Sequence, residues 1–283
     1  MERALPWAVR VVWALMPFAA GPAFASALHD RSAPVQHVGS VGLWLAWAVI
    51  LAASLVRHPL ALTVVRIGVP AALAAAAVAS LSTHSAATLA MATSTLATAL
   101  VLLPETAQAY VNGAAYPGER RFPLRVPGPL LLGPLELAWA ATIGPPAAGM
   151  LLLAARQWVA GGVLLVAGGA AAVILARALH GLSRRWLVFV PAGLVVHDPI
   201  ALADPVLFRR QTISGLALAA ADTEAFDLTQ RALGMALELT LNETSLLQLG
   251  GREGRAVHAR AVLVAPTRPG GVVREATGRR LVR

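Results

Sequence analysis

The stretch WVAGGVLLVAGGAAAVILARALHGLSRRWLVFV, residues 158–190, contains the change of character that decides the fold. Its first part, Trp158–Ala176, carries no charge and approaches the roughly 20 apolar residues that cross a bilayer as a helix. Arg184 and Arg185 then mark the end of the apolar region. The run that follows, Trp186–Val190, is short, bulky and β-branched, which is typical of a strand. The chain therefore changes here from membrane-type to β-type sequence.

Upstream of this point the chain is apolar almost throughout. We expect about six transmembrane helices in all, because each run has roughly the length of a membrane span. The sequence thus predicts a membrane α-helical bundle over residues 1–180 and a small β-rich α+β domain over residues 181–283. The five earlier runs are Val11–Leu28, Val38–Val56, Leu60–Ser82, Ala86–Leu103 and Leu130–Ala155, with a polar loop predicted over Pro104–Pro129.

Composition agrees with a membrane protein. Mean hydropathy is +0.67 and 13% of residues are charged, against about a quarter in soluble domains. The net charge of +9 comes from arginines, many of them at the ends of apolar runs, where they orient spans and meet lipid headgroups. This distribution argues against nucleic-acid binding. The chain has no cysteine, which excludes disulfides, thiolate metal sites and cysteine nucleophiles. Arginine without lysine and abundant alanine suggest a GC-rich bacterial genome.

The arginines also predict the orientation in a bacterial cytoplasmic membrane. Because basic loops stay inside, we expect the N-terminus and the C-terminal domain to be cytoplasmic. An alternative follows from Ala25-Ser26-Ala27, which resembles a signal-peptidase site and whose cleavage would leave five spans. Pro17 and Gly21 suit a packed helix, so we expect an uncleaved anchor. The arginines expected inside are Arg3, Arg10, Arg57, Arg120, Arg121, Arg125, Arg177, Arg184 and Arg185, and those outside are Arg31 and Arg156.

Two charged residues lie within the predicted spans, Arg66 in the third and Glu136 in the fifth. Both are six positions into their runs, so each would lie roughly 9 Å below the cytoplasmic interface and the two could form an ion pair. Charged residues at such depth are functional candidates. A structural pair that fixes helix packing is the alternative interpretation.

The fifth run also contains Gly144-Pro145-Pro146. Consecutive prolines remove backbone donors, so we expect a kink or break in this helix. Broken helices line the binding sites of many transporters. In the sixth run Gly161, Gly162, Gly168 and Gly169 place small residues for close helix contact, within the bundle or in a homo-oligomer.

No catalytic motif is recognisable in the sequence, and we expect no cofactor and no catalytic or metal site. His29, Asp30 and His37 could in principle bind a metal, but nothing fixes their geometry. His197-Asp198 precedes Pro199 and lacks a third partner for a catalytic dyad. These observations favour a protein that is not an enzyme.

The C-terminal part predicts a hairpin, Trp186–Asp198, several further strands and a terminal helix over Val272–Leu281. The further strands are predicted at Val206–Arg210, Ile213–Ala219, Ala236–Leu241 and Val257–Ala265.

The hairpin, the segment Leu202–Arg210 with Ile213, and the ending Pro266–Glu275 resemble a bacterial pleckstrin-homology-like (PH-like) domain. Fused to a helical bundle, such a domain is similar to uncharacterised multi-pass membrane proteins of actinobacteria. The resemblance implies a binding or assembly module and brings no catalytic residues.

Three hypotheses follow. The first is a non-enzymatic inner-membrane protein whose bundle anchors a cytoplasmic PH-like module that binds a protein partner. The second is a small transporter or lipid-handling protein with its site at Arg66, Glu136 and the Gly144-Pro145-Pro146 break, in which Glu136→Gln abolishes uptake. An intramembrane enzyme ranks last, because the spans offer few clustered polar groups.

Overall fold

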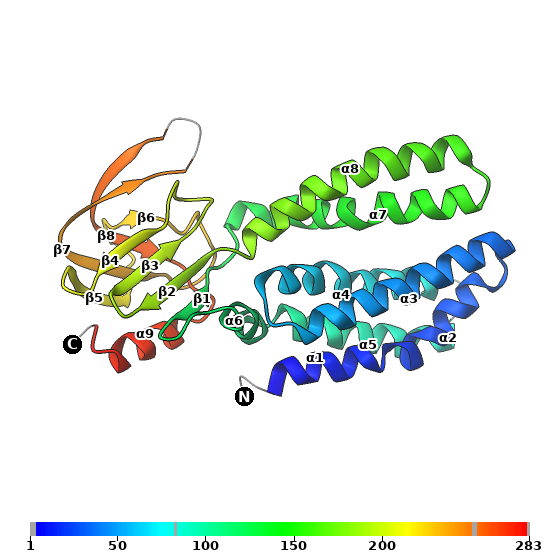
Figure 1. Cartoon of the computed structure of the whole chain (residues 1–283), viewed down its shortest axis with the longest axis horizontal. Coiled ribbons are helices and arrows are strands. Elements are labelled where there is room, and N and C mark those ends of the chain that lie inside the picture. The colour runs from blue at the N-terminus through cyan, green and yellow to red at the C-terminus, as the bar shows by residue number, and fades with distance from the viewer. Residues whose placement is uncertain (1–3, 82–83, 251–253, 282–283) are drawn as a thin grey trace. The chain divides into compact units, whose positions relative to one another are not determined.

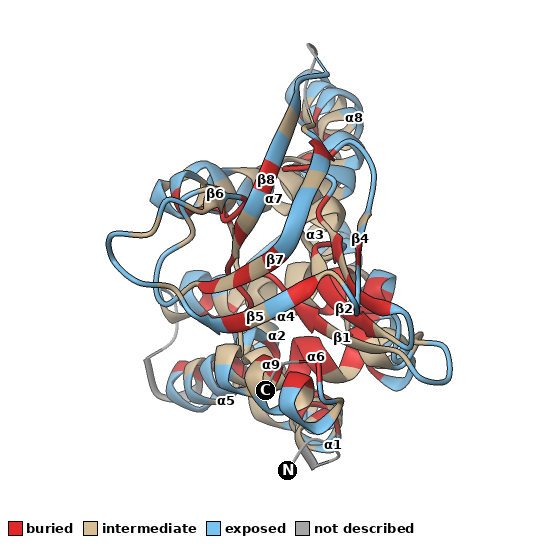
Figure 2. Cartoon of the chain, turned by 90° about the vertical axis from the view of Figure 1, so that its left-hand side faces the viewer, coloured by how far each residue is buried: buried red, intermediate tan, exposed pale blue. Residues whose placement is uncertain are grey.

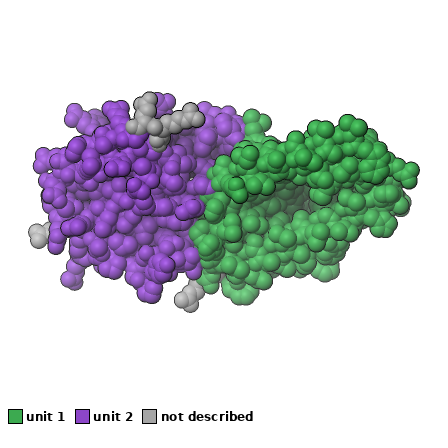
Figure 3. Space-filling model, turned by 45° about the horizontal axis from the view of Figure 1, so that its top comes forward, with its two compact units in different colours: residues 1–110, 136–180 green, residues 111–135, 181–283 purple. Residues whose placement is uncertain are grey.

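The computed structural model describes residues 4–81, 84–250 and 254–281. The chain forms two compact units, each made from separate stretches of sequence (Figure 3). The helical unit comprises residues 1–110 and 136–180, and the β unit comprises residues 111–135 and 181–283. The chain therefore passes between the two units three times.

Eight α-helices account for the apolar part of the described chain (Figure 1). Prolines lie in the first turns of α2, α3 and α4, where their missing N–H has no helical acceptor in any case. The helices are α1 (Ala4–Ala14), α2 (Met16–His29), α3 (Ala33–Leu55), α4 (Pro59–Ser80), α5 (His84–Leu102), α6 (Pro104–Asn112), α7 (Pro134–Ala154) and α8 (Trp158–Leu182).

Within the described residues, five helices are long and apolar enough to cross a membrane. The first of them is the α1–α2 stretch, Leu5–His29. A sixth crossing is added if α5 and α6 count as one span, which bends by 57° between Leu102 and Pro104. The predicted membrane bundle is thus confirmed at the level of five to six apolar helices.

Inside the helical unit α4 packs against α2, α3 and α5. The carbonyls at the end of α3 have no helical donors and are met by side chains from other helices. Arg10 Nε donates to the Ser54 carbonyl at 2.9 Å and its Nη2 to the Leu55 carbonyl at 3.2 Å. Tyr110 Oη also donates to the Ser54 carbonyl, at 3.3 Å. These bonds tie α1, α3 and α6 together at one end of the unit.

Over the residues that the structure describes, the β unit contains two four-stranded sheets and a C-terminal helix, α9 (Pro269–Gly278). The first sheet has the antiparallel order β1-β2-β3-β4, and the second has the order β5-β7-β8-β6, in which the short β6 runs parallel to β8. The strands are β1 (Arg120–Pro123), β2 (Trp186–Val190), β3 (Gly193–His197), β4 (Val206–Arg209), β5 (Ile213–Leu218), β6 (Phe226–Asp227), β7 (Leu237–Gln248) and β8 (Ala256–Val264).

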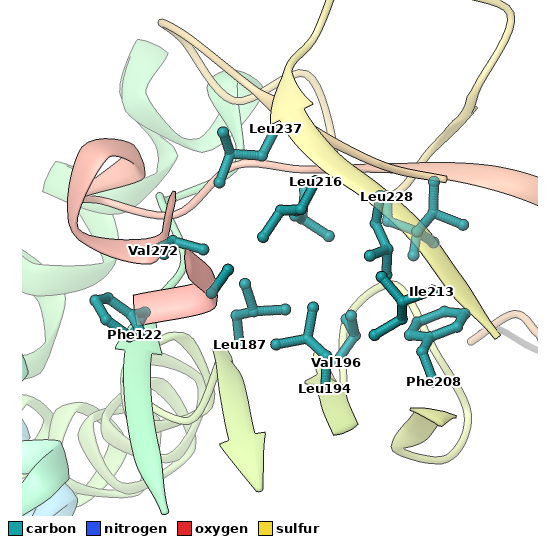
Figure 4. Packing of buried hydrophobic residues seen from close by; sticks show 14 of the residues in the cluster. Phe122, Leu187, Leu194, Val196, Phe208, Ile213, Leu216, Leu228, Leu237 and Val272 are labelled. Carbon is teal, nitrogen blue, oxygen red and sulfur yellow. The ribbon is translucent and has the colours of Figure 1, made fainter. Parts of the chain in front are cut away.

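The core of the β unit comes from the alternation of side chains along these strands. Leu187 and Phe189 of β2 point inward, and Leu194 and Val196 of β3 join them. Figure 4 shows this layer facing the second sheet, with Val272 of α9 packed beside it. In the first part of β7, Leu237–Leu241, buried residues alternate with half-buried ones (Figure 2). The predicted hairpin, the further strands and the terminal helix are present, but β7 extends seven residues beyond the expected end at Leu241, and β6 is additional.

The segment Pro104–Pro129, predicted as a loop, is structured instead. It contains α6 and β1, and a 3-10 helix, η1 (Gly128–Leu132), begins at its end. β1 pairs with β2, so that Phe122 lies opposite Leu187. The β unit thus begins at residue 111 and not at residue 181, and α7 and α8 form a helical hairpin inserted between its first two strands. β1 escaped the sequence analysis because four residues that start with two arginines look like a loop until their partner strand is known.

Candidate functional site

The predicted ion pair between Arg66 and Glu136 is not formed in the structure. Arg66 lies on α4 and is half-buried, whereas Glu136 lies in the first turn of α7 and is exposed. Among the described residues neither side chain makes an ion pair with the other. A carboxylate in the first turn of a helix is favoured by the positive end of the helix dipole, which gives Glu136 a reason for its position that does not involve Arg66.

The Gly144-Pro145-Pro146 sequence does not break its helix. α7 runs without interruption from Pro134 to Ala154, although the prolines remove the donors for the carbonyls of Ala141 and Thr142. Pro145 instead packs against α8: a Cβ on Gly168 would lie 2.5 Å from the Cβ of Pro145. Pro145 therefore contributes to helix packing, and the predicted break in this helix is wrong.

The structure does gather polar groups around one stretch of α4. Thr63, 5% exposed, contacts Nδ1 of His180 on α8 through its Oγ1 at 2.8 Å. The indole N–H of Trp139 on α7 donates to the Ile67 carbonyl at 2.9 Å. Arg66 shares the face of Thr63, three residues away. Three helices thus contribute polar groups to the stretch Thr63–Ile67 of α4, which contains Arg66.

Arg66 is the unusual member of this region. Its Nε atom is buried and has no hydrogen-bond partner within the part of the chain that the structure describes. A buried guanidinium donor without an acceptor is costly, and it has the chemistry to bind an anionic group or a carbonyl. Arg66 therefore stays a binding-site candidate, without Glu136. Sequence reasoning missed His180; its signal was a histidine at the polar end of the last apolar run.

In the β unit, residues 185 and 198 form a buried ion pair. Arg185 Nε and Nη2 donate to the two carboxylate oxygens of Asp198 at 2.7 and 2.6 Å, and the side chains are 1% and 0% exposed. The remaining Nη1 donates to the Arg125 carbonyl at 2.6 Å. The N–H groups of Ile200 and Ala201 donate to Asp198 Oδ1 at 3.1 and 3.3 Å. The pair is satisfied on both sides and is structural.

His197 points to the opposite face of the sheet and stacks on Trp186, with the ring centroids 5.3 Å apart. Arg121 lies over the Trp186 ring, with its Cζ 5.3 Å from the ring centroid. Burial, followed by the positive charge of Arg184, lowers the pKa of His197 from its usual 6.5, and Asp198 opposes this shift. The net shift favours the neutral imidazole of His197. Since Asp198 is held by Arg185, the two neighbours do not form a catalytic dyad.

A small pocket opens in the β unit where β4 ends, β5 begins and the pairing of β7 with β8 shifts register. Its volume of about 210 Å³ is below the usual range for small-molecule sites, about 300–1,000 Å³. Arg209 and Glu243 give its rim both charge signs. The lining residues are Leu207, Phe208, Arg209, Thr212, Leu241, Glu243, Thr244 and Ser245.

Over the described residues, no three histidine, cysteine, aspartate or glutamate side chains lie close enough together to hold a metal ion. His37 Nδ1 lies 2.6 Å from the Ala33 carbonyl within its own helix. Comparison of the chain with family models, curated proteins and solved structures gives no match.

Proposed function

We propose that this protein is a non-enzymatic integral membrane protein that holds a PH-like binding or assembly module at the inner membrane. The observation that carries the proposal is the composition of the β unit from residues 111–135 and 181–283. The chain reaches this one module from α6, leaves it into α7 and returns from α8. A module with three chain connections to membrane helices stays at the membrane, as an anchored binding module must.

The architecture of the β unit supports its PH-like character. A meander of four antiparallel strands is followed by a second sheet and then by a C-terminal helix. Val272 and Ala276 of that helix are fully buried in the core. The sequence resemblance rested on the hairpin, the β4 region and the last segment, and all three belong to this arrangement.

We place partner binding at the pocket between β4, β5 and β7. Its size fits an anchor side chain, and its rim charges, Arg209 and Glu243, would orient a polar partner. Arg260 Nη2 donates to the Asn242 carbonyl at 3.2 Å, and the Asn242 N–H donates to the Thr212 carbonyl at 2.8 Å. These bonds fix the backbone at the pocket wall, so the pocket is preformed.

The test uses tagged full-length protein solubilised from membranes of its own host. Thr244→Trp fills the pocket, and Thr277→Trp, at an exposed position on α9, is the matched control. We expect a protein that co-purifies in fixed ratio with the unmodified chain and with the control to be lost with Thr244→Trp. The proposal fails if no such protein exists, if both variants behave alike, or if the purified protein turns over a substrate.

A second candidate, a small transporter or lipid-handling protein, is favoured by one observation: Arg66 Nε is buried and has no hydrogen-bond partner among the residues that the structure describes. It predicts that Arg66→Gln abolishes uptake or lipid binding in proteoliposomes while the protein stays folded. Arg31→Gln, at an exposed position between α2 and α3, is the control. Glu136→Gln tests the second charged residue of this predicted site by itself, because Glu136 does not contact Arg66. Loss of folded protein with Arg66→Gln would indicate a packing role instead.

A further inference from the structure

Two segments of the β unit expose large apolar side chains. Leu132, at the end of η1, is 84% exposed, and Leu233 and Met235, in the loop between β6 and β7, are 67% and 61% exposed. Isolated apolar residues on a surface need no explanation, but neighbouring ones on a fixed loop do.

The loop Thr229–Met235 is held in a defined conformation by specific contacts. Arg125 Nη1 donates to the carbonyls of Leu233 and Met235 at 3.2 and 2.8 Å. Gly234 has φ +95°, and a Cβ there would lie 2.8 Å from the same Arg125 nitrogen. Gln230 and Arg231, with φ of 57° and 56°, are also left-handed, which costs free energy for residues with a side chain. These contacts fix a loop conformation in which Leu233 and Met235 are exposed to solvent.

The same loop lies against η1. Gly128, the first residue of η1, approaches the Arg231 carbonyl so closely that a Cβ could not be accommodated. Both segments belong to the β unit, so the exposed apolar residues of η1 and of the loop come from adjoining parts of one surface.

Chain continuity places this surface near the bilayer. η1 ends at Leu132, and α7, a candidate membrane span, begins at Pro134. Two residues of extended chain cover at most about 7 Å, and the headgroup regions add roughly 5–8 Å on each side of the hydrocarbon core. Leu132 therefore lies at the membrane interface if α7 crosses the membrane. The loop that packs on η1 must then lie close to the same interface.

The charge of the loop suits lipid as well. Arg231 is exposed beside the apolar residues of the loop, and basic residues flanking apolar ones are typical of segments that lie in the headgroup region of anionic membranes.

We propose that the loop Thr229–Met235, together with Leu132, inserts into the lipid headgroup region, with Leu233 and Met235 in contact with acyl chains and Arg231 with lipid phosphates. The occupant of this surface is the bilayer itself. The inference goes beyond partner binding at the β4–β5–β7 pocket and does not depend on it.

The absence of cysteine from the sequence allows a direct test with single-cysteine variants of the full-length protein. Leu132→Cys, Leu233→Cys and Met235→Cys probe the proposed surface. Leu218→Cys is the control, because Leu218 is 58% exposed on β5. Each variant carries an environment-sensitive fluorophore in vesicles of mixed zwitterionic and anionic phospholipid. Nitroxide-labelled lipid then quenches from the membrane and iodide from water.

We expect lipid quenching at the three proposed positions to exceed that at the control severalfold, with iodide quenching reduced in parallel. Adding Arg231→Glu to Met235→Cys should lower lipid quenching, while adding Arg255→Glu, at an exposed position directly before β8, should not. Quenching at Leu233→Cys and Met235→Cys that matches the control overturns the proposal. Shielding of these positions from both quenchers overturns it too, because a protein partner or a second copy would then cover the loop.

Discussion

At the scale of single residues, the Arg185–Asp198 ion pair of the β unit is buried on both sides. Removing one partner leaves a buried charge without compensation, so Arg185→Met should lower the free energy of unfolding by about 3–5 kcal/mol. The measurement is thermal or chemical unfolding of full-length protein in detergent, followed by the near-ultraviolet signal of Trp186 and its neighbours.

Arg184→Met is the matched control, because this neighbouring arginine is exposed and should change stability by no more than about 0.5 kcal/mol. The double variant Arg185→Met/Asp198→Leu should lose less than the single variants together, because no unpaired charge remains. Equal effects of Arg184→Met and Arg185→Met on the free energy of unfolding would show that the Arg185–Asp198 ion pair does not stabilise the fold.

His197 gives the β unit a pH dependence of known sign. Its folded-state pKa lies below the unfolded value of 6.5, so the unfolded chain binds the proton more tightly. The free energy of unfolding therefore falls as the pH drops below about 6.5, and this loss is absent above about pH 7. Arg184→Gln should raise the pKa of His197 towards 6.5, because Arg184 lowers it. Titration of the imidazole resonances by NMR measures the shift.

Arg209→Gln, at an exposed position on β4, controls for the loss of any arginine and should leave the titration of His197 unchanged. An imidazole pKa above 6.5 in the unmodified protein, or one that does not respond to Arg184→Gln, would contradict this account.

At the scale of elements, Gly161, Gly162, Gly168 and Gly169 of α8 divide into two pairs with different roles. A Cβ on Gly161 would lie 2.7 Å from the Leu153 nitrogen of α7, while a Cβ on Gly162 would meet nothing within 4 Å. Gly161→Val should therefore destabilise the helical unit by about 1–3 kcal/mol through overpacking. Gly162→Val carries the same side chain on the next residue and should be nearly neutral. Titration with sodium dodecyl sulfate, followed by circular dichroism, measures both.

A larger loss of stability for Gly162→Val than for Gly161→Val would contradict this account. It would mean that Gly162 and Gly169, which meet nothing within 4 Å here, form the helix contact, as in a homo-oligomer. The sequence identified the small-residue face of this helix correctly but not which pair α7 uses. Sequence spacing gives the faces of a helix, whereas the choice between neighbouring faces depends on the partner helix.

At the scale of the whole molecule, β1 decides which fragment can fold alone. A fragment of residues 181–283 lacks Phe122, which is 3% exposed in the core, and the strand that pairs with β2. The fragment also lacks the Arg125 carbonyl, which accepts a hydrogen bond from Arg185. We expect this fragment to lack a cooperative unfolding transition. A version with residues 113–132 joined through a flexible linker to residue 183 should regain one, as calorimetry would show.

The linker version with Phe122→Asp is the control for nonspecific effects of added chain and should behave like the short fragment. Cooperative unfolding of residues 181–283 alone would show that β1 is dispensable. An unfolded short fragment, in contrast, does not count against the proposed binding module.

The pairing of β1 with β2 also constrains membrane topology. Both strands must lie on one side of the membrane, so α7 and α8 together cross it an even number of times. Four crossings precede β1 if α5–α6 is a span, and three do if it is not. α5 has 19 residues, about 28 Å of helix, which nearly matches the hydrocarbon core of about 30 Å. We therefore expect four crossings, with residue 57 on the side of the β unit.

Thiol labelling of Arg57→Cys, Arg31→Cys and Leu218→Cys in sealed, oriented vesicles checks this. Equal protection of residues 57 and 218, with residue 31 on the other side, supports six spans. Residue 31 on the same side as residue 218 would instead make α5–α6 a re-entrant segment.

The sequence by itself determined the features that depend on residues close together along the chain. Apolar runs of sufficient length become helices because lipid offers no hydrogen-bond partners to the backbone, and the short, bulky and β-branched run at Trp186–Val190 is typical of a strand. Only the tertiary structure decided the boundary of the β unit, the separation of Arg66 from Glu136 and the contact of Thr63 with His180. β1 is four residues long and its partner strand follows about 60 residues later, so no local pattern reveals it. Helix depth alone does not specify which faces meet, because that choice depends on packing between segments distant in the sequence.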